Sequence, residues 1–586
     1  MRHKKVFLNL LMVLFSIFIV QGAIPTTKGF KKLNLIYSDA IKSLNEVTSH
    51  AQLPKAMTQL KKLEKKCEND PSIIAVLKSD LQSCPEKLKP TYLQSLKLQS
   101  DLKDAAKRLA MGGILQSDQY GVDFNNFMNK IKLSDDSIQE QPLLEGAPYE
   151  SKEDRDKRMK WWRDGKFGMF IHYGLYSGLG GEVKGKKYEG CVEWIQMQSG
   201  LDSESYAAEA IDKFTPKSGK AAEWVKLAKE AGCTYTVLTT RHHEGYNMFD
   251  TKFTDFNVKK TKGIDIVEEY SHACKEEGIK AGYYVSLLDW SHPDYDPSNS
   301  GISYPKGNYD AQTQGKRQFG NHKKYKEYLL NIFDELTTNY PVDLVWWDFS
   351  QPNFQGDHAW GATKLMHTLF NKNPNAIQNN RLYHSDNHLS EGGIKVTPTW
   401  KGDYSTAEHH VPATGIDGDW ETCQTLNGTW GYSADNQKWK SSEDLIHELI
   451  DVVSRGGNFL LNIGPEPDGS IPAESVRIFK EIGSWMDKNN EAIYGTRANP
   501  FDVEFEWGRV TRKGDDLTYL FVYDKPENNT LSIPCLFDNN IEASLLDGGD
   551  KIKVTQDNIN KKSSFNIADI TLQKGATVIK VTGKRK

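Results

Sequence analysis

The sequence predicts an α/β protein: a (β/α)8-type barrel with a C-terminal antiparallel β-sandwich and an extra N-terminal helical module. Short apolar runs alternate with amphipathic helical patterns over roughly 340 residues, as in a parallel sheet with helical crossovers. An alternation of this length suits a barrel with loop insertions better than an open doubly wound sheet. After Asn499 the helical periodicity stops, and short strands stand between turn-rich segments instead.

The first 22 residues have the pattern of a secretory signal peptide. Arg2–Lys5 is basic, and Val6–Val20 is an apolar stretch too short for a spanning helix of about 20 residues. Gly22 and Ala23 supply the small residues of a cleavage site. We therefore expect residues 1–22 to be removed, and the mature protein to be exported without a membrane span. A periplasmic, extracellular or lysosome-like compartment would follow.

Residues 30–132 predict a helical accessory module. They are rich in Lys, Leu and Ser, and their leucines recur at helical spacing. The polar, acidic stretch that follows predicts a linker over 133–154. Cys67 and Cys84 are in positions to join two neighbouring helices, although seven cysteines in 586 residues do not make a disulfide scaffold.

Residues 155–495 carry the barrel pattern. The predicted strands are Phe167–Ile171, Tyr235–Thr239, Ile279–Leu287, Val342–Trp347 and Asn458–Ile463. The predicted helices are Lys217–Ala231, Ile264–Glu277, His322–Thr338, Ser442–Ser454 and Ala473–Lys488.

Residues 499–586 predict the β-sandwich, because short apolar strands alternate there with turn residues. The predicted strands are Val503–Phe505, Thr518–Tyr523, Ala543–Leu546 and Ala576–Val581.

Composition and motifs exclude several classes of protein. With 38% hydrophobic residues the chain can bury large cores, so it is not a disordered protein. A formal net charge of −4 without a long basic run argues against a nucleic-acid binder. Neither a GxGxxG after a strand nor a P-loop is present, so nucleotide binding has no support.

Charged and histidine side chains follow the predicted strands where each strand ends. His172 comes directly after the first apolar run, and the second leads into Arg241–Glu244. The third closes on Asp289 and the fourth on Asp348. Reacting residues of parallel barrels stand at these carboxyl ends, and charged groups are costly to bury without partners. The recurrence therefore predicts a functional site.

Asp348 is the strongest candidate, since it ends a buried strand beside two tryptophans. One interpretation is a loop cap or the N-cap of the next helix. The other is a carboxylate in a closed, ring-lined pocket, as a glycosidase nucleophile requires.

The adjacent His242 and His243 also admit a metal site. Neighbouring residues of a strand point to opposite faces, so the pair would be poor joint ligands unless both lie in the loop. Hydrogen bonding to sugar hydroxyls suits them better, and we expect neither metal nor cofactor.

Several segments in one order resemble a known family. They are Gly165–Gly174, Glu193–Trp194, Thr240–Tyr246, Tyr283–Tyr284 before Asp289–Trp290, Trp346–Asp348, Thr406–Glu408, Trp420–Cys423 with Trp430–Tyr432, and Asn462–Pro465. Over about residues 155–495 this pattern is similar to the α-L-fucosidases of glycoside hydrolase family 29, whose usual C-terminal β-domain the chain also matches. Residues 30–145 are not part of the pattern.

The resemblance implies roles for individual residues in a retaining mechanism. Asp348 matches the nucleophile, and Glu408 matches the general acid/base, with Glu421 as a nearby rival. Arg381 resembles the arginine beside the nucleophile. Carboxyl groups of retaining enzymes lie about 5–5.5 Å apart. The fucose pocket would consist of His172, Glu193, Trp194, His242, His243, Tyr284 and Trp346, with Trp346 or Trp194 against the fucose methyl.

The resemblance implies an exported, exo-acting α-L-fucosidase that acts on fucosylated oligosaccharides, glycoproteins or polysaccharides. An α-L-galactosidase on the same scaffold is a close alternative, because L-galactose differs from L-fucose only by a hydroxyl on C6. A non-catalytic sugar-binding protein and a metal-dependent hydrolase are the others. The sequence leaves linkage preference and oligomeric state open.

Overall fold

The structure is a computed structural model. It describes residues 26–47, 52–77, parts of 86–105, 152–295, 321–350, 355–382, 402–413, 415–416, 418–501, 503–549 and 551–586. Contacts divide the chain into two compact units, residues 1–147 and 148–586. The predicted signal peptide, most of the predicted linker and Cys84 lie outside the described residues.

The first unit contains the α-helices α2 (Thr27–Asn45), α3 (Leu53–Asn69) and α4 (Pro71–Leu77), and the described residues from 90 to 105 are also helical. Thr26 caps α2, since its hydroxyl accepts a hydrogen bond from Gly29 N at 3.1 Å. The apolar faces meet in one core that includes Phe30, Leu60 and Val76. The described helices occupy the region predicted to be helical, whereas the limits of an accessory module at 30–132 stay a prediction.

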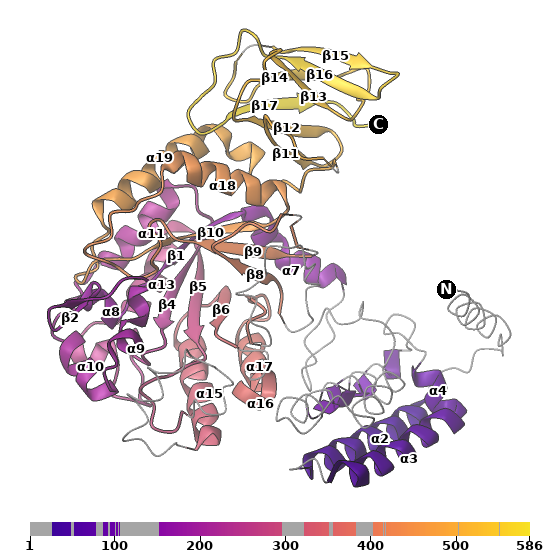
Figure 1. The fold of residues 1–586 in the computed structure, drawn as a ribbon, viewed down its shortest axis with the longest axis vertical. Helices are drawn as coiled ribbons and strands as arrows, with labels where there is room; N and C mark the ends of the chain where they lie inside the picture. Colours follow the sequence, from indigo (N-terminus) through magenta and orange to yellow (C-terminus); the bar gives the residue numbers. More distant parts are fainter. Residues whose placement is uncertain are drawn as a thin grey trace. The chain divides into compact units, whose positions relative to one another are not determined.

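The second unit is built on one eight-stranded parallel sheet that curls on itself (Figure 1). Its order along the sheet is β7-β6-β5-β4-β1-β10-β9-β8. The strands are β1 (Phe167–Ile171), β4 (Tyr235–Arg241), β5 (Lys280–Ser286), β6 (Leu344–Asp348), β7 (Ile377–Gln378), β8 (Ser405–Glu408), β9 (Trp420–Gln424) and β10 (Asn458–Ile463). The five predicted strands are all present.

The two edge strands of this sheet approach each other at a seam. Asn379, just after β7, forms a parallel bridge with Tyr404, just before β8. The N–H of Asp403 donates to the carbonyl of Gln378 at 2.8 Å. The eight parallel strands therefore form a curled half-barrel whose edges meet at one short contact.

Helices pack around this sheet, and the first of them adds Met159 and Trp162 to a core with Phe170 and Trp346 of the strands. They are α7 (Lys152–Gly165), α8 (Leu175–Leu179), α9 (Ile195–Ser199), α10 (Ser203–Ala210), α11 (Lys220–Glu230), α12 (Val258–Lys262), α13 (Ile266–Glu277), α15 (His322–Asn339), α16 (Gly356–Trp360), α17 (Ala362–Lys372), α18 (Ser442–Ser454) and α19 (Ala473–Asn489). The expected alternation is incomplete, because the described residues between β8 and β9 form no helix.

Two antiparallel sheets follow. One has the order β11-β12-β17-β14 and the other β13-β16-β15, and both contribute to one core with Val510, Leu520 and Phe565. Their strands are β11 (Gly508–Lys513), β12 (Leu517–Val522), β13 (Thr530–Ile533), β14 (Glu542–Leu545), β15 (Lys553–Asp557), β16 (Lys562–Asn566) and β17 (Thr577–Thr582).

One predicted strand of this region is wrong. Val503–Phe505 forms only an isolated bridge between Phe505 and Gly508, and the first strand begins at Gly508 instead. Phe505 is buried in the core, whereas Val503 is 47% exposed, so only one of the two apolar residues of this run is buried.

Within the described part of the chain, no helix combines the length and apolarity needed to cross a bilayer.

Candidate active site

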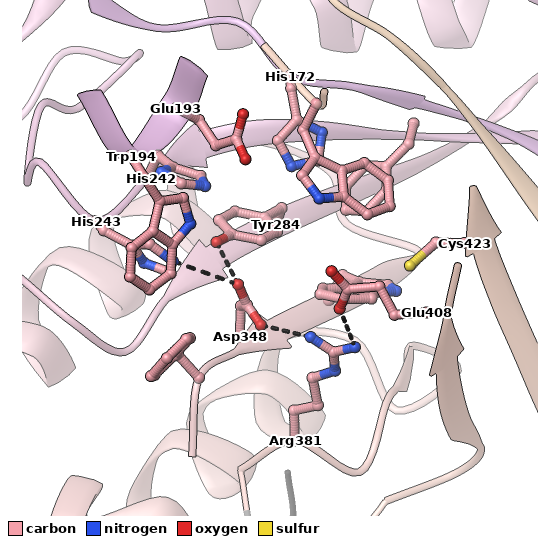
Figure 2. A pocket seen from close by; sticks show the side chains of 14 residues that line it. His172, Glu193, Trp194, His242, His243, Tyr284, Asp348, Arg381, Glu408 and Cys423 are labelled. Carbon is pink, nitrogen blue, oxygen red and sulfur yellow. Dashed lines mark hydrogen bonds and ion pairs between the residues drawn. The ribbon is translucent and has the colours of Figure 1, made fainter. Parts of the chain in front are cut away.

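One cavity at the carboxyl ends of the parallel strands brings all the predicted site residues together (Figure 2). It encloses about 370 Å³, its open mouth included. The predicted residues that line it are His172, Glu193, Trp194, His242, His243, Tyr284, Trp346, Asp348, Arg381 and Glu408. Phe170, Phe349, Cys423 and Trp430 complete the lining.

Strand alternation places Asp348 in the cavity. In β6 Trp346 and Asp348 share one face, while Trp347 between them packs outward on Phe333 of α15 with ring centroids 4.6 Å apart. Tyr284 of β5 lies in register with Trp346, and its hydroxyl donates to Asp348 Oδ2 at 2.6 Å. The carboxylate thus ends a strand with an aromatic floor beneath it.

Arg381 connects the two predicted catalytic carboxylates. Its Nη1 donates to Asp348 Oδ1 at 2.6 Å, and its Nη2 donates to Glu408 Oε2 at 2.9 Å. The guanidinium carbon lies 4.3 Å from the Trp346 ring centroid, and Nε donates to Thr406 Oγ1. The side chain is only 1% exposed, so the fork is fixed by its partners.

Glu408 and its rival Glu421 occupy different places. Glu408 ends β8 and lines the cavity, with its side chain 20% exposed. Glu421 is fully buried and does not line the cavity; its oxygens accept hydrogen bonds from Tyr235 at 2.6 Å and from Trp346 Nε1 at 3.0 Å. Burial raises the pKa of Glu421 to about 7. Glu421 therefore supports the aromatic floor, and Glu408 faces the cavity.

His172 presents a hydrogen-bond acceptor to the cavity. Burial lowers its pKa to about 3, so the ring is neutral. Its Nδ1 lies 2.7 Å from Asn462 Oδ1, and the Asn462 amide nitrogen donates to Trp430 O at 2.7 Å. Because that leaves Oδ1 as the acceptor, Nδ1 carries the proton and Nε2 keeps its lone pair.

His243 has the same tautomer for a different reason. The Ser286 hydroxyl donates to Leu288 O at 2.9 Å, so His243 Nδ1, 2.6 Å from that hydroxyl, must donate to it. Burial, with Arg241 and Arg381 nearby, lowers the pKa of His243 to about 3. Its Nε2 faces Asp348 Oδ2 at 3.7 Å as an acceptor.

His242 and His243 both line the cavity although they are adjacent. The register between β4 and β5 shifts at Thr239/Arg241, and β4 ends at Arg241, so the pair lies beyond the strand where alternation no longer applies. His242 stacks on Tyr284 with centroids 5.3 Å apart, and burial lowers its pKa well below 6.5. Among the described residues no three His, Cys, Asp or Glu side chains gather as metal ligands.

Glu193 is a buried carboxyl group in the cavity wall, and its pKa lies near neutral pH. Its Oε2 accepts from Gly431 N at 3.1 Å, while Oε1 is buried without a hydrogen-bond partner among the described residues. Burial raises its pKa to about 7, so below that pH it carries a proton that it can donate.

Sequence reasoning missed four lining residues as site residues. Two of them follow from strand period, since Phe170 lies two residues before His172 and Cys423 lies opposite Glu408 in the β8–β9 register. Trp430 stacks on His172 with centroids 5.1 Å apart. Phe349 has a φ of 79°, in the left-handed region, and no pattern in the sequence predicts this conformation.

Comparisons with known proteins identify the family of this chain. The family model described as Alpha-L-fucosidase matches residues 137–491. The chain is 29% identical over 408 residues to an α-L-fucosidase of Dictyostelium discoideum, covering 66% of this chain and 82% of that protein. It is 30% identical over 398 residues to the tissue α-L-fucosidase of Homo sapiens, covering 64% and 77%.

Solved structures give the same result. α-L-Fucosidase isoenzyme 1 from Paenibacillus thiaminolyticus superposes with a TM-score of 0.64 at 32% identity, covering 73% of this chain and 99% of that one. A GH29 α-L-fucosidase from Bacteroides thetaiotaomicron, solved as a trapped covalent intermediate with 2-fluoro-fucosyl fluoride, superposes with a TM-score of 0.63 at 28% identity, covering 75% and 99%. The chain therefore belongs to the α-L-fucosidases of glycoside hydrolase family 29.

Proposed function

We propose that this protein is an exported, exo-acting enzyme that hydrolyses terminal α-L-fucosyl residues with retention of configuration. The observation that carries the proposal is the pair Asp348 and Glu408 on the two nitrogens of one guanidinium. Carboxylates bound in this way lie within a nanometre of each other, a range that includes the separation of about 5–5.5 Å in retaining enzymes. The covalent intermediate of the Bacteroides relative supports the same chemistry.

In the first step Asp348 attacks the anomeric carbon and forms an ester bond to it. The bond from that carbon to the glycosidic oxygen breaks, and Glu408 gives its proton to the departing oxygen. In the second step a water oxygen attacks the same carbon and the ester bond breaks. The proton of the water returns to Glu408, so the enzyme is restored and needs no cofactor.

The cavity supports binding of a single sugar ring. His172 and His243 direct Nε2 lone pairs into it and so accept hydrogen bonds from sugar hydroxyls, while protonated Glu193 donates one. Trp194 and Trp346 supply apolar faces for the C6 methyl. The small volume favours removal of terminal residues over cleavage within a chain.

Export rests on residues 1–22, the basic and apolar leader. Fucosylated oligosaccharides, glycoproteins and polysaccharides outside the cytoplasm are the substrates that this location implies. The test is to determine the location and the N-terminus of the protein in its host; protein retained in the cytoplasm with Met1 intact would contradict export.

The function is tested with p-nitrophenyl α-L-fucoside and its L-galactoside counterpart. We expect kcat/KM for the fucoside to exceed that for the galactoside at least ~10-fold, because a C6 hydroxyl would be buried against tryptophan. NMR should show α-L-fucose as the first product. Hydrolysis of neither substrate would favour a sugar-binding protein, and release of the β-anomer first would refute retention. Loss of activity with a chelator, restored by zinc, would indicate a metal-dependent hydrolase.

A further inference from the structure

His409 follows Glu408 directly and packs beside Trp430, two residues that line the cavity. Its side chain is 43% exposed, and its ring centroid is 4.8 Å from that of Trp430. Its φ is 60°, in the left-handed region. A non-glycine residue there costs about 1 kcal/mol. A residue that served only to turn the chain would more favourably be glycine.

The hydrogen bonds around His409 fix which nitrogen carries its proton. Gln424 Nε2 donates to Glu448 Oε1 at 2.7 Å, and Thr425 N donates to Gln424 Oε1 at 2.9 Å. Gln424 Oε1 is therefore an acceptor. His409 Nδ1 lies 3.1 Å from this oxygen and must donate to it. In the neutral ring Nε2 then keeps its lone pair.

That lone pair lies beside the oxygen that would deliver the proton in catalysis. Glu408 Oε2 accepts a hydrogen bond from Arg381, which has only donors, so the acidic proton belongs on Oε1. His409 Nε2 is 3.8 Å from Oε1, too far for a hydrogen bond between them. If a glycosidic oxygen lies within hydrogen-bond reach of Oε1, the neighbouring hydroxyl groups of the departing sugar lie next to His409.

We propose that His409 recognises the leaving group: its Nε2 accepts a hydrogen bond from a hydroxyl of the sugar unit to which fucose is attached. The rings of His409 and Trp430 form the wall against which that sugar packs. The inference rests on the proposed function, since it takes Glu408 as the acid/base, and it makes His409 a specificity-determining residue. The class of ligand is a hydroxylated saccharide, in contrast to an alkyl or aryl aglycone.

The experiment compares three substrates that separate recognition from acid catalysis. The p-nitrophenyl fucoside has a good leaving group without a neighbouring hydroxyl. Methyl α-L-fucoside also lacks the hydroxyl but has a poor leaving group that needs Glu408. A fucosyl disaccharide has both a poor leaving group and hydroxyls. The variant is His409→Phe, which keeps a ring on Trp430 and removes the lone pair.

We expect His409→Phe to lower kcat/KM for the disaccharide about 10-fold, chiefly through KM, the effect of one hydrogen bond. Both other substrates should stay within about twofold. His409→Asn, which keeps an acceptor and tolerates positive φ, should recover part of the loss. His272→Phe, on the exposed side of α13, is the matched control and should change none of the three.

Three outcomes would overturn the inference. Equal losses on the disaccharide and the methyl fucoside would mean that His409 acts through Glu408. Equal losses on all three, with a lower Tm, would mean a structural role, and no loss on the disaccharide would exclude the hydrogen bond. If the wild-type protein hydrolyses none of the three, the proposed function itself fails, which is a distinguishable result.

Discussion

The hydroxyl of Tyr284 and the guanidinium of Arg381 each hold one oxygen of Asp348, both at 2.6 Å. The carboxylate is thus clamped from the β5 side and from the β7 side. In the proposed mechanism, a nucleophile fixed at both oxygens would keep its aim at the anomeric carbon, and the same donors would stabilise it as it leaves in the second step.

Replacing Tyr284 by Phe should slow that second step. A hydrogen bond to a charged group contributes about 1.5–3 kcal/mol, so we expect kcat to fall about 10-fold or more and the covalent intermediate to accumulate. Pre-steady-state kinetics with the nitrophenyl fucoside would show this as a burst. Tyr283→Phe is the matched control, because Tyr283 bonds Ser271 and Pro341 O on the outer face of the same strand. Equal kcat values for the two variants would contradict the assignment.

Replacing Asp348 by Gly should abolish turnover by at least ~1,000-fold, because the covalent step has no other nucleophile. Added azide should restore part of the activity and yield a β-fucosyl azide, since the anion can enter the space of the lost side chain. Asp343→Asn, just before the opposite end of β6, serves as a control for folding. A wild-type rate in Asp348→Gly would exclude Asp348 as the nucleophile.

Glu408→Gln and Glu421→Gln should separate the two rival acids. Without a proton donor, Glu408→Gln should lose far more activity on the methyl fucoside than on the nitrophenyl fucoside, by ~100-fold or more. Glu421→Gln should show the same ratio between these substrates as the wild type. The opposite pattern would assign acid catalysis to Glu421.

Glu421→Gln should also change how stability depends on pH. Burial raises the pKa of Glu421 to about 7, so the folded protein holds a proton that the unfolded chain releases near pH 4.5. The wild type therefore loses stability as pH rises from 4.5 to 7, by up to about 1–3 kcal/mol, and the amide variant does not. The Tm difference, variant minus wild type, should increase between pH 5 and pH 8. The exposed Glu276→Gln is the control, and a difference independent of pH would refute the shift.

Strands with continuous apolar runs could be predicted from sequence, and β1 and β10 have the predicted bounds. β9 could not, because its five residues are all buried and yet include Glu421, Thr422 and Gln424 in place of an apolar run. Glu421 is accommodated only by hydrogen bonds from Tyr235 and Trp346, residues of other strands. Such tertiary compensation is invisible in a local window.

The catalytic candidates could be predicted largely through family motifs, and the structure brings all of them to one cavity. The tautomers of the cavity histidines could not be predicted, nor could the fact that Glu408 lines the cavity while Glu421 does not. Both depend on contacts between distant residues, such as that of His172 with Asn462, 290 positions away. His409 escaped prediction because an exposed loop histidine carries no periodic signal.

Arg381 also connects the two edge strands of the curled sheet. Arg381 follows β7, and its side chain donates hydrogen bonds to Asp348 on β6 and to Thr406 and Glu408 on β8. One side chain therefore links the two edges of the sheet. An opening of the sheet between these two edges would separate Asp348 from Glu408, the proposed nucleophile and acid/base. The contact between the edge strands and the pairing of the two proposed catalytic carboxylates would then be lost together.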